Sequence, residues 1–324
     1  MLIDELLQRV VKEQASDGFV TAGAPPSIKI DGQIYPISKA RYTDEQTRDI
    51  VLSTMNERQR EEFLRSHECN FALAVPNLGR FRVNALVQRG SMSLVVRRIH
   101  TEIPEITELG LPPIIKELAM TKRGLVIFVG ATGTGKSTSL AAMVGYRNQN
   151  SRGHIISIED PIEFIHDHGN CLVTQREVGI DTESFDVALK NTLRQAPDVI
   201  MIGEVRSADT MAQALTFAET GHLCLCTLHA NNANQALDRI INFFPEERRP
   251  QLLMDLSMNM QCIVSQRLIP TVDKKRCAAI EILLGTPMVA DLILKGEIDG
   301  IKEVMQKSEN IGMKTFDSAL FELF

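Results

Sequence analysis

The sequence predicts an α/β protein with two domains: an α+β domain over residues 1–102 and a larger domain over residues 114–324. Three observations support this prediction. Helices and short strand-like runs are grouped in the first part, whereas strands and helices alternate in the second. Between them, residues 103–113 read IPEITELGLPP, with three prolines, one glycine and no periodicity, which is typical of a linker. A chain of 324 residues is long enough to give each domain its own core.

In the first part, apolar residues at helical spacing predict a helix that ends near Ala15. Strand-like runs over 18–22, 27–30 and 33–37 follow. Thr43 and Gln46 form a capping-box pattern that opens a second helix, and Asn56 caps a third. Strands are then expected over residues 70–75, 80–88 and 93–99.

In the second part, buried strands are expected over residues 125–129, 154–159, 198–203 and 222–228. Helices are expected between and after them, over residues 136–146, 184–195, 207–219 and 232–243. This alternation predicts a mostly parallel sheet with helices on both faces. The remainder reads as predominantly helical, with one strand candidate over 278–283.

The formal net charge of −6 argues against a broad surface for nucleic acid. No apolar run approaches 18 residues, and the first 20 residues carry Asp4, Glu5 and Glu13 instead of a basic and then apolar leader. We therefore expect a cytosolic chain that neither inserts into a membrane nor binds nucleic acid.

Six cysteines lie mostly in apolar, strand-like stretches without a CxxC pair, so buried free thiols are expected. Period two places Cys224 and Cys226 on one strand face. A metal site made by this pair with His222 or His229 is the minor alternative.

The strand over 125–129 runs into GATGTGKS, which fits the phosphate-binding pattern G-x-x-x-x-G-K-[ST]. Its glycines allow a tight turn that aims backbone N–H groups at an anion, and the helix that follows adds its positive end. Lys136 supplies a charge for the β and γ phosphates, and Ser137 offers a hydroxyl to Mg²⁺. The alternative is a glycine-rich turn that matches the pattern by chance and binds no phosphate. The predicted nucleotide contacts are Gly130, Ala131, Thr132, Gly133, Thr134, Gly135, Lys136, Ser137 and Thr138.

Acidic residues follow two of the buried strands, in Glu159-Asp160-Pro161-Ile162-Glu163 and in Gly203-Glu204-Val205-Arg206. If the sheet is parallel, both groups reach the edge where the phosphates bind. One interpretation is a carboxylate that activates water together with one near Mg²⁺, and the other is helix caps or solvated loop charges.

His222 and His229 flank the strand over 222–228. A histidine beside a strand is usually a core residue whose ring nitrogens are hydrogen-bonded within the protein. His229 follows its strand on the ligand side, as the acids do, so we expect it to sense the γ-phosphate.

Four ordered segments, LVIFVGATGTGKST, HIISIEDPIEF, DVIMIGEVR and TGHLCLCTLHANNA, resemble the secretion and type IV pilus motor ATPases. The resemblance spans nearly the whole chain and is greatest to the PilT-like retraction branch, within it to the PilU group. It implies an N-terminal PAS-like domain, a RecA-like ATPase domain with a helical C-terminal part, and a ring hexamer that uses ATP and Mg²⁺.

The resemblance also implies roles for single residues. Glu163 would polarise the attacking water, Glu204 would be the Walker B acid near the metal, and Glu159 and His222 would contribute to the nucleotide site. Arginines of the N-terminal domain would act on the phosphates, and the matching residues are Arg80, Arg82, Arg97 and Arg98. A salt-bridged sheet surface is the alternative reading of these arginines.

The implied function is ATP-driven pilus retraction at the inner face of the cytoplasmic membrane, with a PilT-type ATPase and an inner-membrane platform protein as partners. Val289-Ala-Asp-Leu-Ile-Leu replaces the AIRNLI-type motif of PilT proper, which favours the PilU group. The alternatives are an extension or secretion motor, against which the missing four-cysteine zinc insert counts, and a nucleotide-switched regulator with little turnover.

Overall fold

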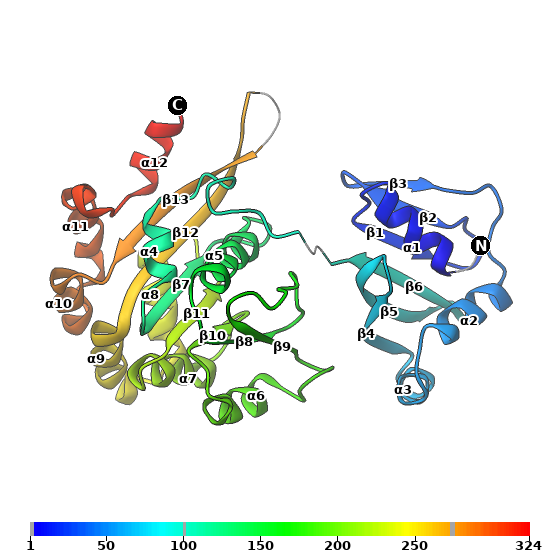
Figure 1. Cartoon of the computed structure of the whole chain (residues 1–324), viewed down its shortest axis with the longest axis horizontal. Helices are drawn as coiled ribbons and strands as arrows, with labels where there is room; N and C mark the ends of the chain where they lie inside the picture. Colours follow the sequence, from blue (N-terminus) through cyan, green and yellow to red (C-terminus); the bar gives the residue numbers. More distant parts are fainter. Residues whose placement is uncertain (1–2, 100–101, 273–275) are drawn as a thin grey trace. The chain divides into compact units, whose positions relative to one another are not determined.

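The computed structural model describes residues 3–99, 102–272 and 276–324 (Figure 1). The chain divides into two compact units, Met1–Thr101 and Glu102–Phe324. The segment over 103–113, predicted as a linker, therefore belongs to the second unit. Ile106 and Leu111 lie buried in that unit's core, because apolar residues among the prolines pack against the helix that follows.

The first unit is a six-stranded antiparallel sheet in the order β3-β2-β1-β6-β5-β4. Its strands are β1 (Asp17–Val20), β2 (Ser27–Ile30), β3 (Gln33–Pro36), β4 (Glu68–Val75), β5 (Gly79–Gln88) and β6 (Ser91–Arg98). Its helices are α1 (Ile3–Lys12), α2 (Asp44–Ser53) and α3 (Glu57–Ser66). The predicted capping box at Thr43 is present, and Asn56 caps α3 as predicted, in a capping box with Gln59. The helices and one sheet face share a single apolar core. The opposite face carries Asn70 of β4, Arg82 and Asn84 of β5, and Val95 and Arg97 of β6.

The second unit is built on a seven-stranded sheet in the order β13-β12-β7-β11-β10-β8-β9. All neighbouring strands are parallel except β12 and β13, which form an antiparallel pair at one edge. The strands are β7 (Gly124–Val129), β8 (His154–Glu159), β9 (Leu172–Glu177), β10 (Val199–Ile202), β11 (Leu223–Leu228), β12 (Met260–Pro270) and β13 (Arg276–Leu284). The α/β class predicted from the alternation of strands and helices is confirmed.

Two strands were not predicted. The prediction that the C-terminal remainder is helical apart from 278–283 is wrong for β12, which pairs with β7. Its run MQCIVSQ is buried nearly throughout, so it shows neither the alternation of a half-exposed strand nor a helical stripe. The other strand, β9, reads LVTQRE and lies at the sheet edge, where its polar residues resemble a loop.

Helices cover both faces of this sheet. They are α4 (Ile114–Ala119), α5 (Lys136–Asn150), α6 (Phe185–Thr192), α7 (Ala208–Glu219), α8 (Ala233–Phe243), α9 (Arg249–Asn259), α10 (Pro287–Lys295), α11 (Ile301–Lys307) and α12 (Phe316–Leu323). The helix predicted over 184–195 ends earlier, because its last turn, Leu193–Gln195, is a 3₁₀ turn.

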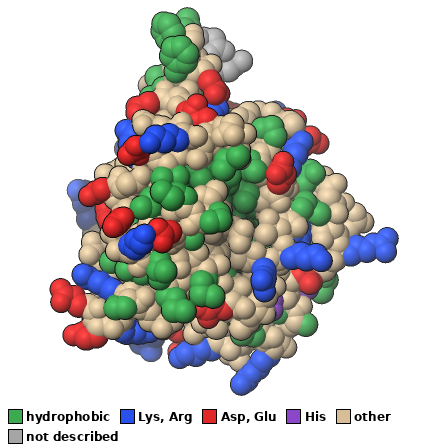
Figure 2. All heavy atoms as spheres, turned by 90° about the vertical axis from the view of Figure 1, so that its left-hand side faces the viewer, with side chains coloured by type: hydrophobic (Ala, Val, Ile, Leu, Met, Phe, Trp, Pro, Cys, Tyr) green, Lys and Arg blue, Asp and Glu red, His purple; other side chains and the backbone are tan. Residues whose placement is uncertain are grey.

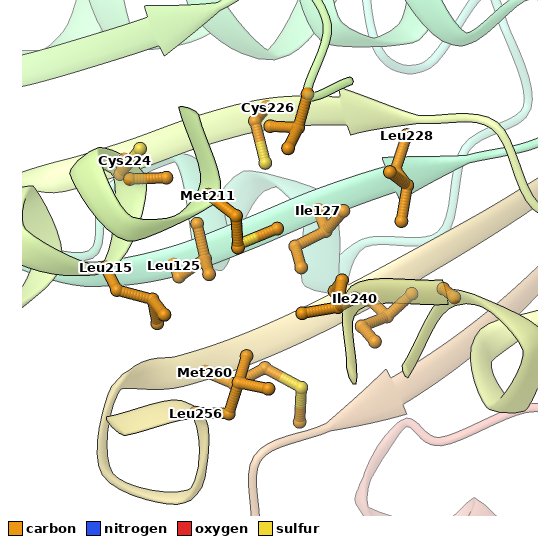
Figure 3. Packing of buried hydrophobic residues seen from close by; sticks show 14 of the residues in the cluster. Leu125, Ile127, Met211, Leu215, Cys224, Cys226, Leu228, Ile240, Leu256 and Met260 are labelled. Atoms are coloured by element: carbon orange, nitrogen blue, oxygen red, sulfur yellow. The ribbon is translucent and has the colours of Figure 1, made fainter. Parts of the chain in front are cut away.

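Strand β7 shows how the two faces form. Leu125, Ile127 and Val129 lie in one apolar cluster with helices α6 to α11, whereas Val126 and Phe128 lie in the other with α4 and α5. Cys224 and Cys226 belong to the first cluster, among Ile127, Met211 and Leu228 (Figure 3). As predicted, they share one face, and they fill the core as free thiols.

Charges of both signs lie on the face of the protein that Figure 2 shows. The face in Figure 2 carries basic and acidic side chains interspersed with apolar ones, in keeping with a modest net charge. Within the described residues, no helix is both long and apolar enough to cross a membrane.

Candidate functional site

A pocket of about 310 Å³ lies at the carboxyl ends of the parallel strands β7, β8, β10 and β11. Eight predicted site residues line it: Thr132, Gly133, Lys136, Ser137, Glu159, Glu163, Glu204 and His229. Leu140, Ala141, Phe164, Phe185 and Met201 supply apolar walls. The prediction that the acids reach the phosphate-binding edge of the sheet is therefore correct.

The loop between β7 and α5 takes the shape that its glycines predict. Gly133 and Gly135 have φ angles of 78° and 85°, which side chains disfavour. At Gly130, an added Cβ would lie 2.6 Å from the backbone oxygen of Gln266, so β12 leaves room only for glycine. Helix α5 then begins at Lys136 and directs its first N–H groups toward the loop. Thr134 Oγ1 donates to the carbonyl oxygen of Ala131 at 2.9 Å within the loop, and Thr138 lies on α5. None of these three predicted contacts lines the pocket.

Lys136 ties this loop together. Its Nζ donates to the carbonyl oxygens of Gly130 and Ala131, at 2.8 Å each, and the residue is only 8% exposed. Burial lowers the pKa of Lys136, while the nearby carboxylates of Glu204 and Glu163 act in the opposite direction. The ammonium group is thus held at the pocket with acidic groups close by.

Glu159 is a buried carboxyl at the end of β8. Ser157 Oγ donates to it at 2.7 Å and Gln175 Nε2 at 3.2 Å, and the backbone amide of Glu163 bonds to the same group. Burial raises the pKa of Glu159 to about 7, because these hydrogen bonds compensate only part of the lost hydration. Glu159 can therefore change its charge near neutral pH.

Glu163 lies in the loop after β8 and is exposed toward the pocket. Two side chains of β9 hold the backbone of this loop. Glu177 Oε2 accepts from the Ile162 amide at 3.2 Å, and Gln175 bonds to Phe164 and His166. Neither Gln175 nor Glu177 was singled out from the sequence. The available signal was the polar run TQRE directly after the short apolar run CLV. It indicates these two residues only after residues 172–177 are recognised as a strand.

Glu204 follows β10 and is engaged on both oxygens. Oε2 accepts from Arg206 Nη2 at 2.7 Å and from its Nε at 2.8 Å, and Oε1 lies 3.1 Å from His229 Nε2. Arg206 also approaches Asp160 at 3.7 Å, and the hydrogen bond with Glu204 raises the pKa of the guanidinium. The carboxylate is therefore held in place by these partners.

The structure separates the two predicted histidines. His229 lines the pocket, whereas His222 precedes β11 and so lies at the opposite end of that strand. Nδ1 of His222 lies 3.1 Å from Thr220 Oγ1 and 3.2 Å from the Phe217 carbonyl oxygen. Within this chain His222 braces the turn between α7 and β11, and it does not reach the nucleotide pocket.

The four predicted arginines lie in the first unit and divide between its sheet faces. Arg82 is directly opposite Arg97 across β5 and β6, and Arg80 shares their face by period two, as predicted. Arg98 is opposite Phe81 and points to the other face. Arg97 Nε donates to Oδ1 of the buried Asp17 at 2.8 Å. Arg82 and Arg97, with Asp17, Asn70, Asn84 and Val95, line a shallow depression of about 250 Å³.

The pocket also fits Mg²⁺ as a companion of a bound phosphate. Among the described residues, no group of three or more His, Cys, Asp or Glu side chains could cage a metal. Mg²⁺ usually takes one or two protein oxygens together with phosphate oxygens and water. The hydroxyl of Ser137, on the first turn of α5, is placed for this role.

A glycine-shaped anion cradle at the carboxyl edge of a parallel sheet, with a buried lysine, a serine and four acidic residues around it, defines a P-loop nucleotide hydrolase. The sequence model described as "Type II/IV secretion system protein" matches residues 1–311. The chain belongs to this family.

Two relatives and one solved structure give the comparison more detail. The chain is 63% identical over 325 residues to the type IV pilus ATPase PilU of Pseudomonas aeruginosa, covering 100% of this chain and 85% of that protein. It is 41% identical over 320 residues to the type IV pilus retraction ATPase PilT of the same organism, covering 99% and 93%. The crystal structure of the pilus retraction motor PilT with bound ADP superposes with a TM-score of 0.94 at 40% identity, covering 100% and 93%.

These similarities confirm the resemblance to the PilT-like branch and the fold of both units. The chain is a P-loop ATPase of this family.

Proposed function

We propose that this chain hydrolyses MgATP to drive type IV pilus retraction as a ring hexamer, together with a PilT-type partner. One observation carries the catalytic part of this proposal. The P-loop, Glu159, Glu163, Glu204 and His229 come from four different strand ends and converge on one pocket. Such convergence is what phosphoryl transfer needs, because catalysis depends on positioning and on charge stabilisation.

Each residue then has a role in the reaction. The P-loop amides and Lys136 bind the β and γ phosphates and stabilise the charge that develops during transfer. The Glu163 carboxylate faces the same pocket and polarises the attacking water. Glu204 orients His229. His229 contacts the γ-phosphate and so senses whether ATP is bound. Mg²⁺, held by Ser137 and phosphate oxygens, would neutralise phosphate charge.

The cellular part of the proposal follows from the relatives. The proteins of 63% and 41% identity are described as pilus ATPases, and one of them as a retraction ATPase. We place this chain in the cytoplasm at the inner face of the membrane, acting on the inner-membrane platform protein of the pilus. The N-terminal arginines would complete the site around the phosphates, which makes closure of the two units part of each catalytic cycle.

A ring can be tested by mixing subunits. Lys136→Ala subunits mixed into wild-type protein should depress phosphate release by more than their fraction, because neighbours in a closed ring pass on domain motion. Loss in strict proportion to the fraction of variant would contradict coupled subunits.

Retraction can be tested in cells that lack this chain and its PilT-type partner. Restoring both proteins should restore retraction of labelled pili, whereas the partner with the Lys136→Ala variant should restore less pulling force. Loss of assembled pili on deletion would instead indicate an extension motor, and loss of a secreted substrate alone would indicate a secretion motor. If pilus retraction requires this chain to bind ATP but not to hydrolyse it, so that Glu163→Gln is fully active in cells, the chain would be a nucleotide-switched regulator.

A further inference from the structure

The loop that carries Glu163 is held from strand β9, on both sides of that residue. Before Glu163, the Ile162 amide donates to Glu177 Oε2 at 3.2 Å. After it, the carbonyl oxygen of Phe164 accepts from Gln175 Nε2 at 2.8 Å. Two residues further on, the His166 amide donates to Gln175 Oε1 at 2.8 Å. Three backbone groups around Glu163 are thus fixed by two side chains.

These two side chains are themselves well placed. Gln175 lies opposite Ser157 and Glu177 lies opposite Glu159 in the parallel pairing of β8 with β9, so both project from the same sheet face. Gln175 Nε2 also donates to the buried carboxyl of Glu159 at 3.2 Å. With its amide oxygen on one backbone N–H and its amide nitrogen on two acceptors, Gln175 has a single favourable orientation.

The side chain of Glu163 has no such support of its own. Among the residues that the structure describes, no partner hydrogen-bonds its carboxylate, which is exposed at the pocket. Its position relative to the P-loop therefore follows from the backbone that carries it. Displacement of a catalytic group by about 1 Å can cost about a hundredfold in rate, so this backbone matters for hydrolysis.

We propose that Gln175 and Glu177 are positioning residues for ATP hydrolysis: they fix the backbone on either side of Glu163 and so place its carboxylate at the phosphate-binding pocket. This inference rests on the proposed role of Glu163. If the two residues only attached β9 to the loop, their loss would not act on hydrolysis through Glu163. A positioning role instead requires that their loss lowers turnover through Glu163 and leaves nucleotide binding intact.

Four substitutions in the full-length chain distinguish a positioning role of Gln175 and Glu177 from a purely structural role. Gln175→Met keeps the length of the side chain and removes both polar ends, and Glu177→Leu removes the acceptor for Ile162. Gln175→Glu keeps an acceptor for His166 but can no longer donate to Phe164. Glu177→Gln is the matched control, because its amide oxygen can still accept from Ile162.

We expect Gln175→Met and Glu177→Leu to lower kcat at least about tenfold while the Kd for ATP changes less than about twofold. Glu177→Gln should stay within about twofold of wild type in both. Hydrogen exchange of a peptide over residues 160–166 should be faster in the two defective variants, because the Ile162 and His166 amides lose their acceptors. Should Gln175→Met fail to fold, Gln175→Glu tests the same residue and should also lower kcat. Should Glu177→Leu fail to fold, the two Gln175 variants test the inference.

The dependence on Glu163 is tested in the double variants. Added to Glu163→Gln, neither Gln175→Met nor Glu177→Leu should reduce the remaining rate further, since the group they position is already changed. Unchanged kcat in the folded single variants, a parallel loss of ATP binding, or losses that multiply in the double variants would each overturn the inference. If Glu163→Gln itself keeps wild-type turnover, the proposed function fails. If it stalls while both β9 variants hydrolyse normally, only this inference fails.

Discussion

Oε1 of Glu204 lies 3.1 Å from Nε2 of His229, and the other oxygen of that carboxylate is paired with Arg206. The acid therefore orients the histidine. We expect Glu204→Gln to lower phosphate release and to raise the Mg²⁺ concentration needed for half-maximal rate, because the pocket loses a negative charge. His229→Ala should lower phosphate release without that shift in Mg²⁺ requirement. Magnesium titrations of both variants check this, and an identical shift in both would contradict separate roles.

Lys136 is predicted to be essential for nucleotide chemistry. Its buried ammonium lies at the pocket, so Lys136→Ala should abolish measurable phosphate release and strongly weaken ATP binding. Lys122→Ala, which changes an exposed lysine of the same unit, is the control and should hydrolyse normally. Near-wild-type turnover in Lys136→Ala would contradict the assignment of residues 130–137 as a P-loop.

Two buried groups of the pocket should give stability opposite dependences on pH. The pKa of Glu159 is raised by burial to about 7, so between about pH 4.5 and 7 the folded state keeps a proton that the unfolded state releases. Its contribution to the free energy of unfolding therefore falls as pH rises through this window. Burial lowers the pKa of His166 to about 4, against a small opposing effect of Asp167. Between about pH 4 and 6.5 only the unfolded state takes up that proton, so this contribution falls as pH falls.

The two contributions oppose each other between about pH 4.5 and 6.5, and single substitutions should separate them. Each carries a slope of up to about 1.4 kcal/mol per pH unit. Glu159→Gln should make the free energy of unfolding rise more steeply with pH, and His166→Gln should make it fall. Denaturant unfolding at several pH values measures both. Superimposable pH profiles for the three proteins would contradict the assigned shifts.

The N-terminal arginines should differ in how they affect stability. Arg97 is paired with the buried Asp17, so Arg97→Gln should lower the free energy of unfolding by about 1–3 kcal/mol. Arg82→Gln should change it by no more than about 0.5 kcal/mol.

For catalysis, we expect neutralisation of at least one of Arg80, Arg82, Arg97 and Arg98 to slow hydrolysis by more than about a hundredfold, because an arginine that contacts a transferring phosphate can contribute about 10³–10⁵ in rate. Turnover measured beside thermal unfolding for each Arg→Gln variant checks both effects. Normal turnover in all four variants would contradict a site completed by the N-terminal unit.

Much of the fold was predictable because its periodic signals are local. The P-loop spacing, the apolar strands and the acids at their ends were read correctly, since a parallel sheet brings strand ends to one edge. What failed depends on tertiary pairing. Strand β12 is buried on both faces, and β9 is polar and at an edge, so neither shows a distinctive period.

The missed residues of the site follow from the missed strands. Gln175 and Glu177 act through backbone groups 9 to 15 residues away in the sequence, a relationship that no local pattern encodes. His222 shows the opposite failure. It was assigned to the site with His229, but the strand between them separates the two by its full length, and only His229 reaches the pocket.

We propose that this pocket hydrolyses ATP with Glu163 as the group that polarises water. The most direct test is phosphate release by Glu163→Gln, measured beside its ATP affinity, with the exposed Glu183→Gln as the control. We predict wild-type affinity with turnover reduced by about 10²–10⁴-fold, because the amide keeps the shape of the side chain but cannot accept a proton. Turnover reduced by less than about tenfold, with affinity unchanged, would contradict it and pass the role to another acid of the pocket, with Glu159 the first to test.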